Sequence, residues 1–137
     1  MTLRTHIQVV GMLMLALGTA HVFFGHYFGW KKELASLSLL TRQVFIVHCF
    51  FIALILMLLG ICSLFYADTL LAPNALSRVL LAGIVVFWLC RLVVQLFVYD
   101  SKIWKGRRFY TAMHIVFSLM WTYFVATYSA AWLAVWR

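Results

Sequence analysis

The sequence predicts an all-α integral membrane protein, an up-and-down bundle of four transmembrane helices. Hydrophobic residues make up 66% of the 137 residues and charged residues only 10%, whereas a soluble domain is roughly half apolar and about a quarter charged. The mean hydropathy is +1.03, and the apolar residues form four long runs joined by short polar connections. We therefore expect one domain over residues 1–137, which excludes a separate soluble catalytic or nucleotide-binding domain.

Each of the four runs is long enough to cross a bilayer. About 20 helical residues, with a rise of about 1.5 Å each, span a hydrocarbon core of about 30 Å. Apolar runs without alternation indicate helices, because only helices and closed barrels satisfy their backbone hydrogen bonds in lipid. The expected spans, in chain order, cover residues 7–28, 44–67, 79–99 and 109–136.

The first span has a face of small residues. Gly11, Gly18 and His21 follow the three-and-four spacing of one helix face, and small residues let neighbouring membrane helices pack closely. We therefore expect His21 to face the bundle. The small residues Gly18 and Ala20 also suit a secretory cleavage site. The apolar run continues past them through Phe24, however, which favours a membrane span.

The other three spans carry their polar residues in different patterns. His48 lies near the start of the second span without polar companions deeper in its helix, so its direction is not predicted. The third span has one polar and aromatic stripe, formed by Trp88, Arg91, Gln95 and Tyr99. The fourth span has a small polar stripe, formed by Thr111, His114, Ser118, Thr122 and Ser129. Both stripes are expected to turn away from lipid.

Lysine and arginine set the expected orientation. The net charge is +8, and most basic residues flank the spans, which indicates contact with anionic lipid headgroups rather than with nucleic acid. The first and third connections carry seven basic residues, Lys31, Lys32, Arg42, Lys102, Lys105, Arg107 and Arg108. The opposite side carries three, Arg4, Arg78 and Arg137. The positive-inside rule then places both termini outside the cytoplasm, in a bacterial-type inner membrane.

Polar groups from all four helices are expected at the basic end of the bundle. Up-and-down topology brings the ends of spans one and three and the starts of spans two and four to one face. At about 1.5 Å per residue, these groups lie about 6 to 14 Å deep. The predicted layer contains His21, His48, Arg91, Gln95 and His114. No carboxylate lies within a span to pair with Arg91, so an anionic ligand is one expected partner. The alternative is Asp100, reached by snorkelling, or backbone carbonyls.

Histidines on facing helices, with arginine at the same end, match what a b-type haem requires. The candidate axial ligands are His21, His48 and His114, and the candidate partners of the haem propionates are Arg42, Arg91, Arg107 and Arg108. The arrangement resembles that of small four-helix haem proteins of bacterial membranes, including the membrane anchors of quinone-linked dehydrogenases. The resemblance implies electron transport as part of an oxidoreductase system.

Two alternatives stay open. The same three histidines, with Gln95 or Asp100, would suit a non-haem metal, although the scarcity of carboxylates counts against it. The protein would otherwise be a non-catalytic accessory or scaffold subunit of a larger membrane complex or a homo-oligomer, with its polar groups forming interhelical hydrogen bonds. We expect His6 to be a solvated terminal residue, and the three cysteines, Cys49, Cys62 and Cys90, to be small buried hydrophobes.

Overall fold

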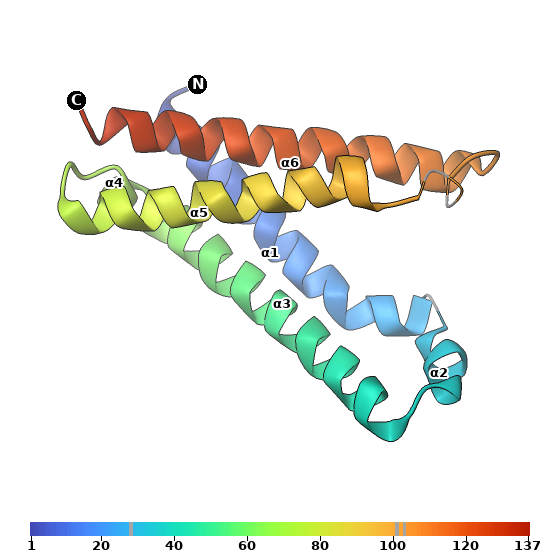
Figure 1. The fold of residues 1–137 in the computed structure, drawn as a ribbon. Helices are drawn as coiled ribbons and strands as arrows, with labels where there is room; N and C mark the ends of the chain where they lie inside the picture. The colour runs from blue at the N-terminus through green and yellow to red at the C-terminus, as the bar shows by residue number, and fades with distance from the viewer. Residues whose placement is uncertain (28, 101, 103) are drawn as a thin grey trace. The chain divides into compact units, whose positions relative to one another are not determined.

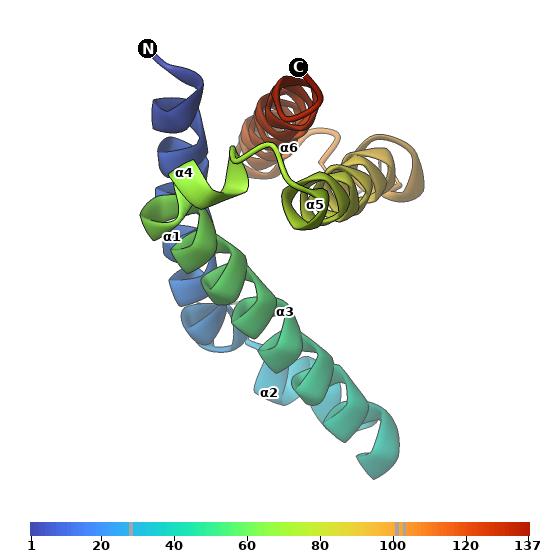
Figure 2. The ribbon, with the colours of Figure 1, turned by 90° about the vertical axis from the view of Figure 1, so that its left-hand side faces the viewer.

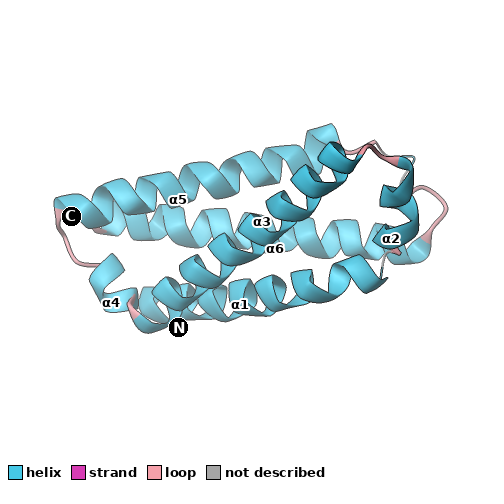
Figure 3. Ribbon diagram, turned by 90° about the horizontal axis from the view of Figure 1, so that it is seen from below, coloured by secondary structure: helices cyan, strands magenta, loops and turns pink. Residues whose placement is uncertain are grey.

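The computed structural model describes residues 1–27, 29–100, 102 and 104–137, without the side chains of residues 24, 26, 27, 31 and 33. Four of its helices are long and apolar enough to cross a membrane (Figure 1). They are α1 (Leu3–Tyr27), α3 (Leu39–Phe65), α5 (Ala75–Val93) and α6 (Arg108–Ala134). No strand occurs in the described part of the chain (Figure 3). The all-α class and the four apolar helices are confirmed, and they are compatible with a multi-pass membrane protein.

Short helical segments that hydropathy does not predict lie between the long helices. A one-turn helix α2 (Trp30–Glu33) and a 3₁₀ turn η1 (Leu34–Ser36) connect α1 to α3. Another one-turn helix, α4 (Ala67–Leu70), follows α3. The last turn after α5 is the π-helical segment η2 (Val94–Val98). Two of these segments carry residues of the candidate sites, because α2 begins with Trp30 and η2 contains Gln95.

Capping side chains explain why two helices begin earlier than the apolar runs. The Ser38 side chain accepts a hydrogen bond from the Thr41 backbone N–H at 3.2 Å, so α3 begins at Leu39 rather than at residue 44. The Asn74 side chain accepts one from the Ser77 N–H at 2.9 Å at the start of α5. Each cap satisfies a backbone donor that has no partner within its helix.

The chain forms two compact units. The first is residues 7–67, which we call the α1–α3 unit, and the second combines Met1–His6 with Asp68–Arg137, which we call the α5–α6 unit. His21, Arg42 and His48 therefore belong to the first unit. Arg91, Gln95, Arg107, Arg108 and His114 belong to the second.

In the α1–α3 unit, two glycines set the point of closest approach. A Cβ added to Gly11 would lie 2.8 Å from the Leu64 backbone nitrogen and 2.9 Å from the Gly60 carbonyl oxygen. Gln8 donates to the Leu64 carbonyl across the same contact at 3.4 Å. The small-residue face of α1 thus packs on α3 as predicted. From this contact α1 and α3 diverge, and α2 lies between their far ends (Figures 1 and 3).

In the α5–α6 unit, the two long helices lie side by side (Figures 1 and 2). Their contact is aromatic: the Trp88 and Trp121 rings stack with centroids 5.0 Å apart, and Phe124 meets Trp88 edge to face at 4.7 Å. All three side chains are buried. This aromatic core fixes the register in which α5 and α6 face each other.

The N-terminal segment is tied to the α5–α6 unit. The ring nitrogen Nδ1 of His6 lies 2.9 Å from the Tyr123 hydroxyl, and Arg4 pairs with Asp68 at 3.1 Å. The expectation that His6 is a solvated terminal residue is therefore wrong. Helix α1 begins at Leu3, several residues before the apolar run, and this extra turn brings the imidazole to α6.

Candidate functional site

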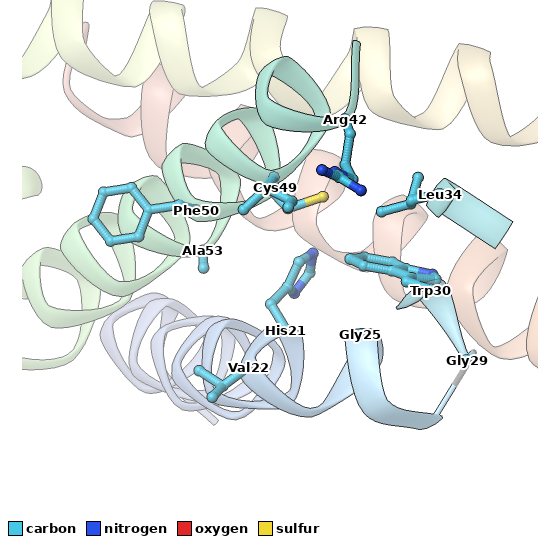
Figure 4. A pocket seen from close by; sticks show the side chains of 11 residues that line it. His21, Val22, Gly25, Gly29, Trp30, Leu34, Arg42, Cys49, Phe50 and Ala53 are labelled. Carbon is cyan, nitrogen blue, oxygen red and sulfur yellow. The ribbon is translucent and has the colours of Figure 1, made fainter. Parts of the chain in front are cut away.

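A cavity of about 590 Å³ lies within the α1–α3 unit, where α1 and α3 diverge (Figure 4). Its walls are mostly apolar and come from α1, α2, η1 and α3. The polar side chains among them are His21 from α1 and Arg42 and Cys49 from α3. Pockets for small molecules and prosthetic groups measure about 300 to 1,000 Å³ and combine apolar walls with a few polar groups. This cavity therefore has the size and character of a binding site.

His21 points into this cavity from α1 (Figure 4). Its Nδ1 lies 2.8 Å from the Leu17 carbonyl oxygen, one turn earlier in the same helix. A carbonyl oxygen can only accept, so Nδ1 carries the proton and donates it. The ring is therefore fixed in the tautomer whose Nε2 holds the lone pair. Metal-binding histidines are commonly oriented in this way by a backbone carbonyl.

Trp30 and Arg42 close the cavity at the α2 end. The Trp30 indole packs edge to face against Phe45, with ring centroids 4.9 Å apart, and a Cβ on Gly25 would lie 3.4 Å from the same indole. Gly29, with φ of 63°, supplies the left-handed turn that starts α2 and places Trp30 there. Arg42 lies in the first turn of α3, with its guanidinium among the side chains that line the cavity (Figure 4).

Three other predicted site residues lie outside this cavity. His48 is exposed on α3, and its Nδ1 lies 2.8 Å from the Val44 carbonyl oxygen. Arg107 and Arg108 are exposed at the start of α6, where the Arg107 guanidinium lies 5.7 Å from the centre of the Tyr110 ring. The structure places none of these three on the walls of the cavity.

In the α5–α6 unit, three predicted residues form one hydrogen-bonded chain. The Arg91 Nη1 donates to the Gln95 Oε1 at 3.2 Å, and the Gln95 Nε2 lies 2.9 Å from the His114 Nδ1. Gln95 is buried in the π-helical segment, and π-helical turns are frequent at functional sites. The Trp104 indole stacks on the His114 ring at 4.0 Å, and Thr111 donates to the Trp104 carbonyl at 2.9 Å.

The polar stripe of α6 is only partly buried within the α5–α6 unit. Ser118 donates to the His114 carbonyl at 2.7 Å and is half-buried, whereas Thr122 is exposed and donates to the Ser118 carbonyl at 2.8 Å. Because each hydroxyl donates to a carbonyl oxygen of its own helix, it needs no hydrogen-bond partner on another helix. That the whole stripe turns away from lipid stays a prediction.

The expected single layer of five residues is divided between the two units. His21 and His48 belong to one unit, and Arg91, Gln95 and His114 to the other, so their convergence stays a prediction. In the described part of the chain, no three His, Cys, Asp or Glu side chains are grouped closely enough to hold a metal ion. A preassembled non-haem metal site is thus not seen among those residues.

Several residues of these two sites were not predicted. Trp30 and Cys49 line the cavity, and Trp104 and Trp121 contact His114 and Arg91. The one sequence signal for such lining residues is helical spacing. Cys49 lies four residues after Phe45, and Gly25 lies four residues after His21, so each pair shares a helix face.

Comparisons with protein-family models, curated proteins and solved structures found no match to this chain.

Proposed function

We propose that this protein is a membrane redox component that binds a b-type haem in the cavity of the α1–α3 unit. Haem supplies one-electron chemistry when bound, and the chain supplies ligation, orientation and enclosure. The observation that carries the proposal is His21, because its Nδ1 is held 2.8 Å from a backbone carbonyl at the wall of a 590 Å³ cavity.

His21 fits the role of an axial ligand. Haem iron binds a neutral imidazole through a lone pair, and the hydrogen bond to Leu17 leaves that lone pair on Nε2. The same bond restricts rotation of the ring, so less orientational entropy is lost when iron is bound. A single proximal histidine holds haem in several protein classes. His48 lies outside the cavity and His114 belongs to the other unit, so a second histidine ligand stays a prediction.

The rest of the cavity fits a flat, largely apolar group with an anionic edge. Trp30, Phe50 and Ile46 offer aromatic and aliphatic contacts, whose burial against a porphyrin is favourable by about 25 cal/mol per Å². Arg42 is the cation among the described residues that line this cavity, and its planar guanidinium can donate two parallel hydrogen bonds to a propionate. Arg91, Arg107 and Arg108 stay predicted propionate partners outside this cavity.

The proposed setting is an up-and-down bundle in a bacterial-type inner membrane. Each of the four apolar helices is joined to the next by a short connection, and the seven-to-three distribution of basic residues favours both termini outside the cytoplasm. Anionic lipid headgroups would then contact the basic connections. Other membrane subunits, or further copies of this chain, are the proposed protein partners.

Substitution of His21 tests the haem site. The full chain is purified in mild detergent from cells supplied with a haem precursor, and bound haem is measured as Soret absorbance per protein. His21→Ala is expected to abolish the Soret band, and added imidazole is expected to restore it by filling the vacated space. Restoration by imidazole separates lost ligation from lost folding. His6→Ala is the matched control, because His6 bonds to Tyr123 and does not line the cavity.

Arg42 provides a graded second test. Arg42→Leu removes a charged hydrogen-bond donor worth about 1.5 to 3 kcal/mol, which corresponds to a roughly tenfold to hundredfold rise in the Kd for haem. Arg108→Leu, an exposed arginine outside the cavity, is the control and should leave the Kd unchanged. Retention of the Soret band in His21→Ala, with no effect of Arg42→Leu, would reject this site. A wild-type protein without haem would favour the accessory-subunit alternative.

A further inference from the structure

Arg91 lies within an apolar helix and has no carboxylate partner among the described side chains. The ion pairs of the α5–α6 unit join Arg4 to Asp68 at 3.1 Å and Lys102 to Asp100 at 3.9 Å, so both of its aspartates are engaged elsewhere. Arg91 instead donates one N–H to Gln95 and lies over the Trp121 ring, with Cζ 5.0 Å from the ring centre. One hydrogen bond uses a single donor of the five that a guanidinium carries.

The hydrogen-bond chain also determines which nitrogen of His114 carries the proton. Because Arg91 can only donate, the Gln95 oxygen must be the atom that faces it, and the amide nitrogen then faces His114. The His114 Nδ1 is therefore an acceptor, and the proton of the neutral ring lies on Nε2. Stacking on Trp104 at 4.0 Å holds the ring in place. His114 thus presents an N–H donor at Nε2.

Two buried indoles add further donors. Trp88 and Trp121 are 1% and 3% exposed, and the Nε1 of each has no hydrogen-bond partner among the described residues. An indole N–H can donate but cannot accept. Most buried polar groups are paired, and an unpaired one costs free energy, so each exception calls for an explanation. Both rings are at the Arg91 level, since Trp88 stacks on Trp121 at 5.0 Å.

We propose that Arg91, Trp88, Trp121 and His114 form a binding site for an oxyanion, either a carboxylate or a phosphate. All four groups offer donors, and one of them carries a full positive charge. A ligand that fits must therefore offer acceptor oxygens and negative charge, which excludes amines and other donors. The unpaired indoles are the observation that separates a ligand site from an arginine satisfied by Gln95 alone. The proposal does not rest on haem binding, because none of these residues lines the cavity of the α1–α3 unit.

Two sources share this chemistry in a membrane. One is the phosphodiester of an anionic phospholipid, and the other is the carboxylate of a fatty acid or similar amphiphile. Both carry a single negative charge on oxygen atoms at the end of an apolar chain. The test must therefore present each of them separately to the same protein.

The experiment follows the indole N–H signals by ¹⁵N NMR. The full chain is placed in dodecyl maltoside micelles, which carry no phosphate or carboxylate, and the Trp88 and Trp121 signals are assigned with Trp88→Phe and Trp121→Phe. Octanoate is titrated in one arm, and phosphatidylglycerol is added to the micelles in the other. Methyl octanoate is the uncharged control. Both indole signals are expected to move downfield and to saturate with at least one of the two anions, but not with the ester.

Substitutions of arginine identify the site. Arg91→Gln should weaken binding at least tenfold, and Arg91→Lys, which keeps the charge but loses the planar fork, should weaken it less. Arg78→Gln is the matched control, because Arg78 lies near the other end of α5 and donates to the Val135 carbonyl at 3.1 Å. Circular dichroism verifies that each variant stays helical.

Each result decides between the sources or against the site. Saturation with octanoate alone assigns a carboxylate ligand, saturation with phosphatidylglycerol alone assigns a lipid phosphate, and saturation with both supports a general oxyanion site. The proposal is overturned if neither anion moves the two indole signals in a saturable way. It is also overturned if Arg91→Gln, still helical, binds as tightly as the wild type.

Discussion

Replacing Gly11 by alanine should damage the α1–α3 unit at its closest contact. The added methyl carbon would lie 2.8 Å from the Leu64 nitrogen, 2.9 Å from the Gly60 oxygen and 3.1 Å from the Ser63 Cβ. Two of these three atoms belong to the backbone of α3, so they cannot move aside as the end of a flexible side chain would. Ordinary contact begins near 3.4 Å, so α1 and α3 must separate by about half an ångström.

The magnitude follows from two opposing effects. Forcing an extra methyl group into a well-packed contact costs about 1 to 3 kcal/mol. Glycine to alanine in a helix interior gains about 0.5 to 1 kcal/mol. The net effect of Gly11→Ala should therefore be a loss of up to about 2.5 kcal/mol. Gly83→Ala on α5 is the matched control, because its added Cβ meets nothing within 4 Å, and it should show the gain alone.

Reversible unfolding in mixed detergent, followed by circular dichroism, measures both variants. The expected order of stability is Gly83→Ala, then wild type, then Gly11→Ala. Separation of α1 from α3 would also reshape the cavity between them, so Gly11→Ala should lower the haem content as well. If Gly11→Ala is as stable as Gly83→Ala, the close packing of α1 on α3 is refuted.

Three further predictions concern two contacts of the α5–α6 unit and the orientation of the chain in the membrane. The His114 Nδ1 should give the ¹⁵N signal of an unprotonated acceptor at neutral pH, and Gln95→Leu should move that signal; a protonated Nδ1 would contradict the assigned direction of the hydrogen bonds. Arg78→Ala should lose about 1 to 2 kcal/mol of stability, because the guanidinium donates to the Val135 carbonyl and lies 4.5 Å from the Trp136 ring centre. Faster amide exchange in the last turn of α6 would detect this loss, and unchanged exchange would argue against the contact. A reporter enzyme fused after Arg137 should be active only outside the cytoplasm, and cytoplasmic activity would reverse the predicted orientation.

The long helices could be predicted from the sequence because each depends only on the composition of its own apolar run. A run of about 20 apolar residues can satisfy its backbone in lipid only as a helix, and no distant contact is needed to establish that. The helix ends depend on single side chains instead. Ser38 extends α3 to Leu39, and hydropathy does not register a cap. The π-helical segment Val94–Val98 has no hydropathy signal at all.

The part of the candidate site that lies on a single helix stripe was predictable from the sequence. The spacing of Trp88, Arg91 and Gln95 places them on one face of the third span, and the structure turns that face toward α6 and His114. The cavity was not predictable, because it depends on how α1 and α3 diverge beyond the Gly11 contact and on where α2 carries Trp30. For the same reason the sequence could not place Cys49 inside the cavity and His48 outside it.

The absorption spectrum of the purified wild-type protein shows whether this chain binds a b-type haem. The protein is produced with a haem precursor, and its spectrum is recorded oxidised and then reduced with dithionite. Haem ligation by His21 predicts a Soret band at close to one haem per chain, with the shift and the sharper visible bands of a b-type haem on reduction. A folded, helical protein with no Soret absorbance under these conditions would contradict haem binding by this chain.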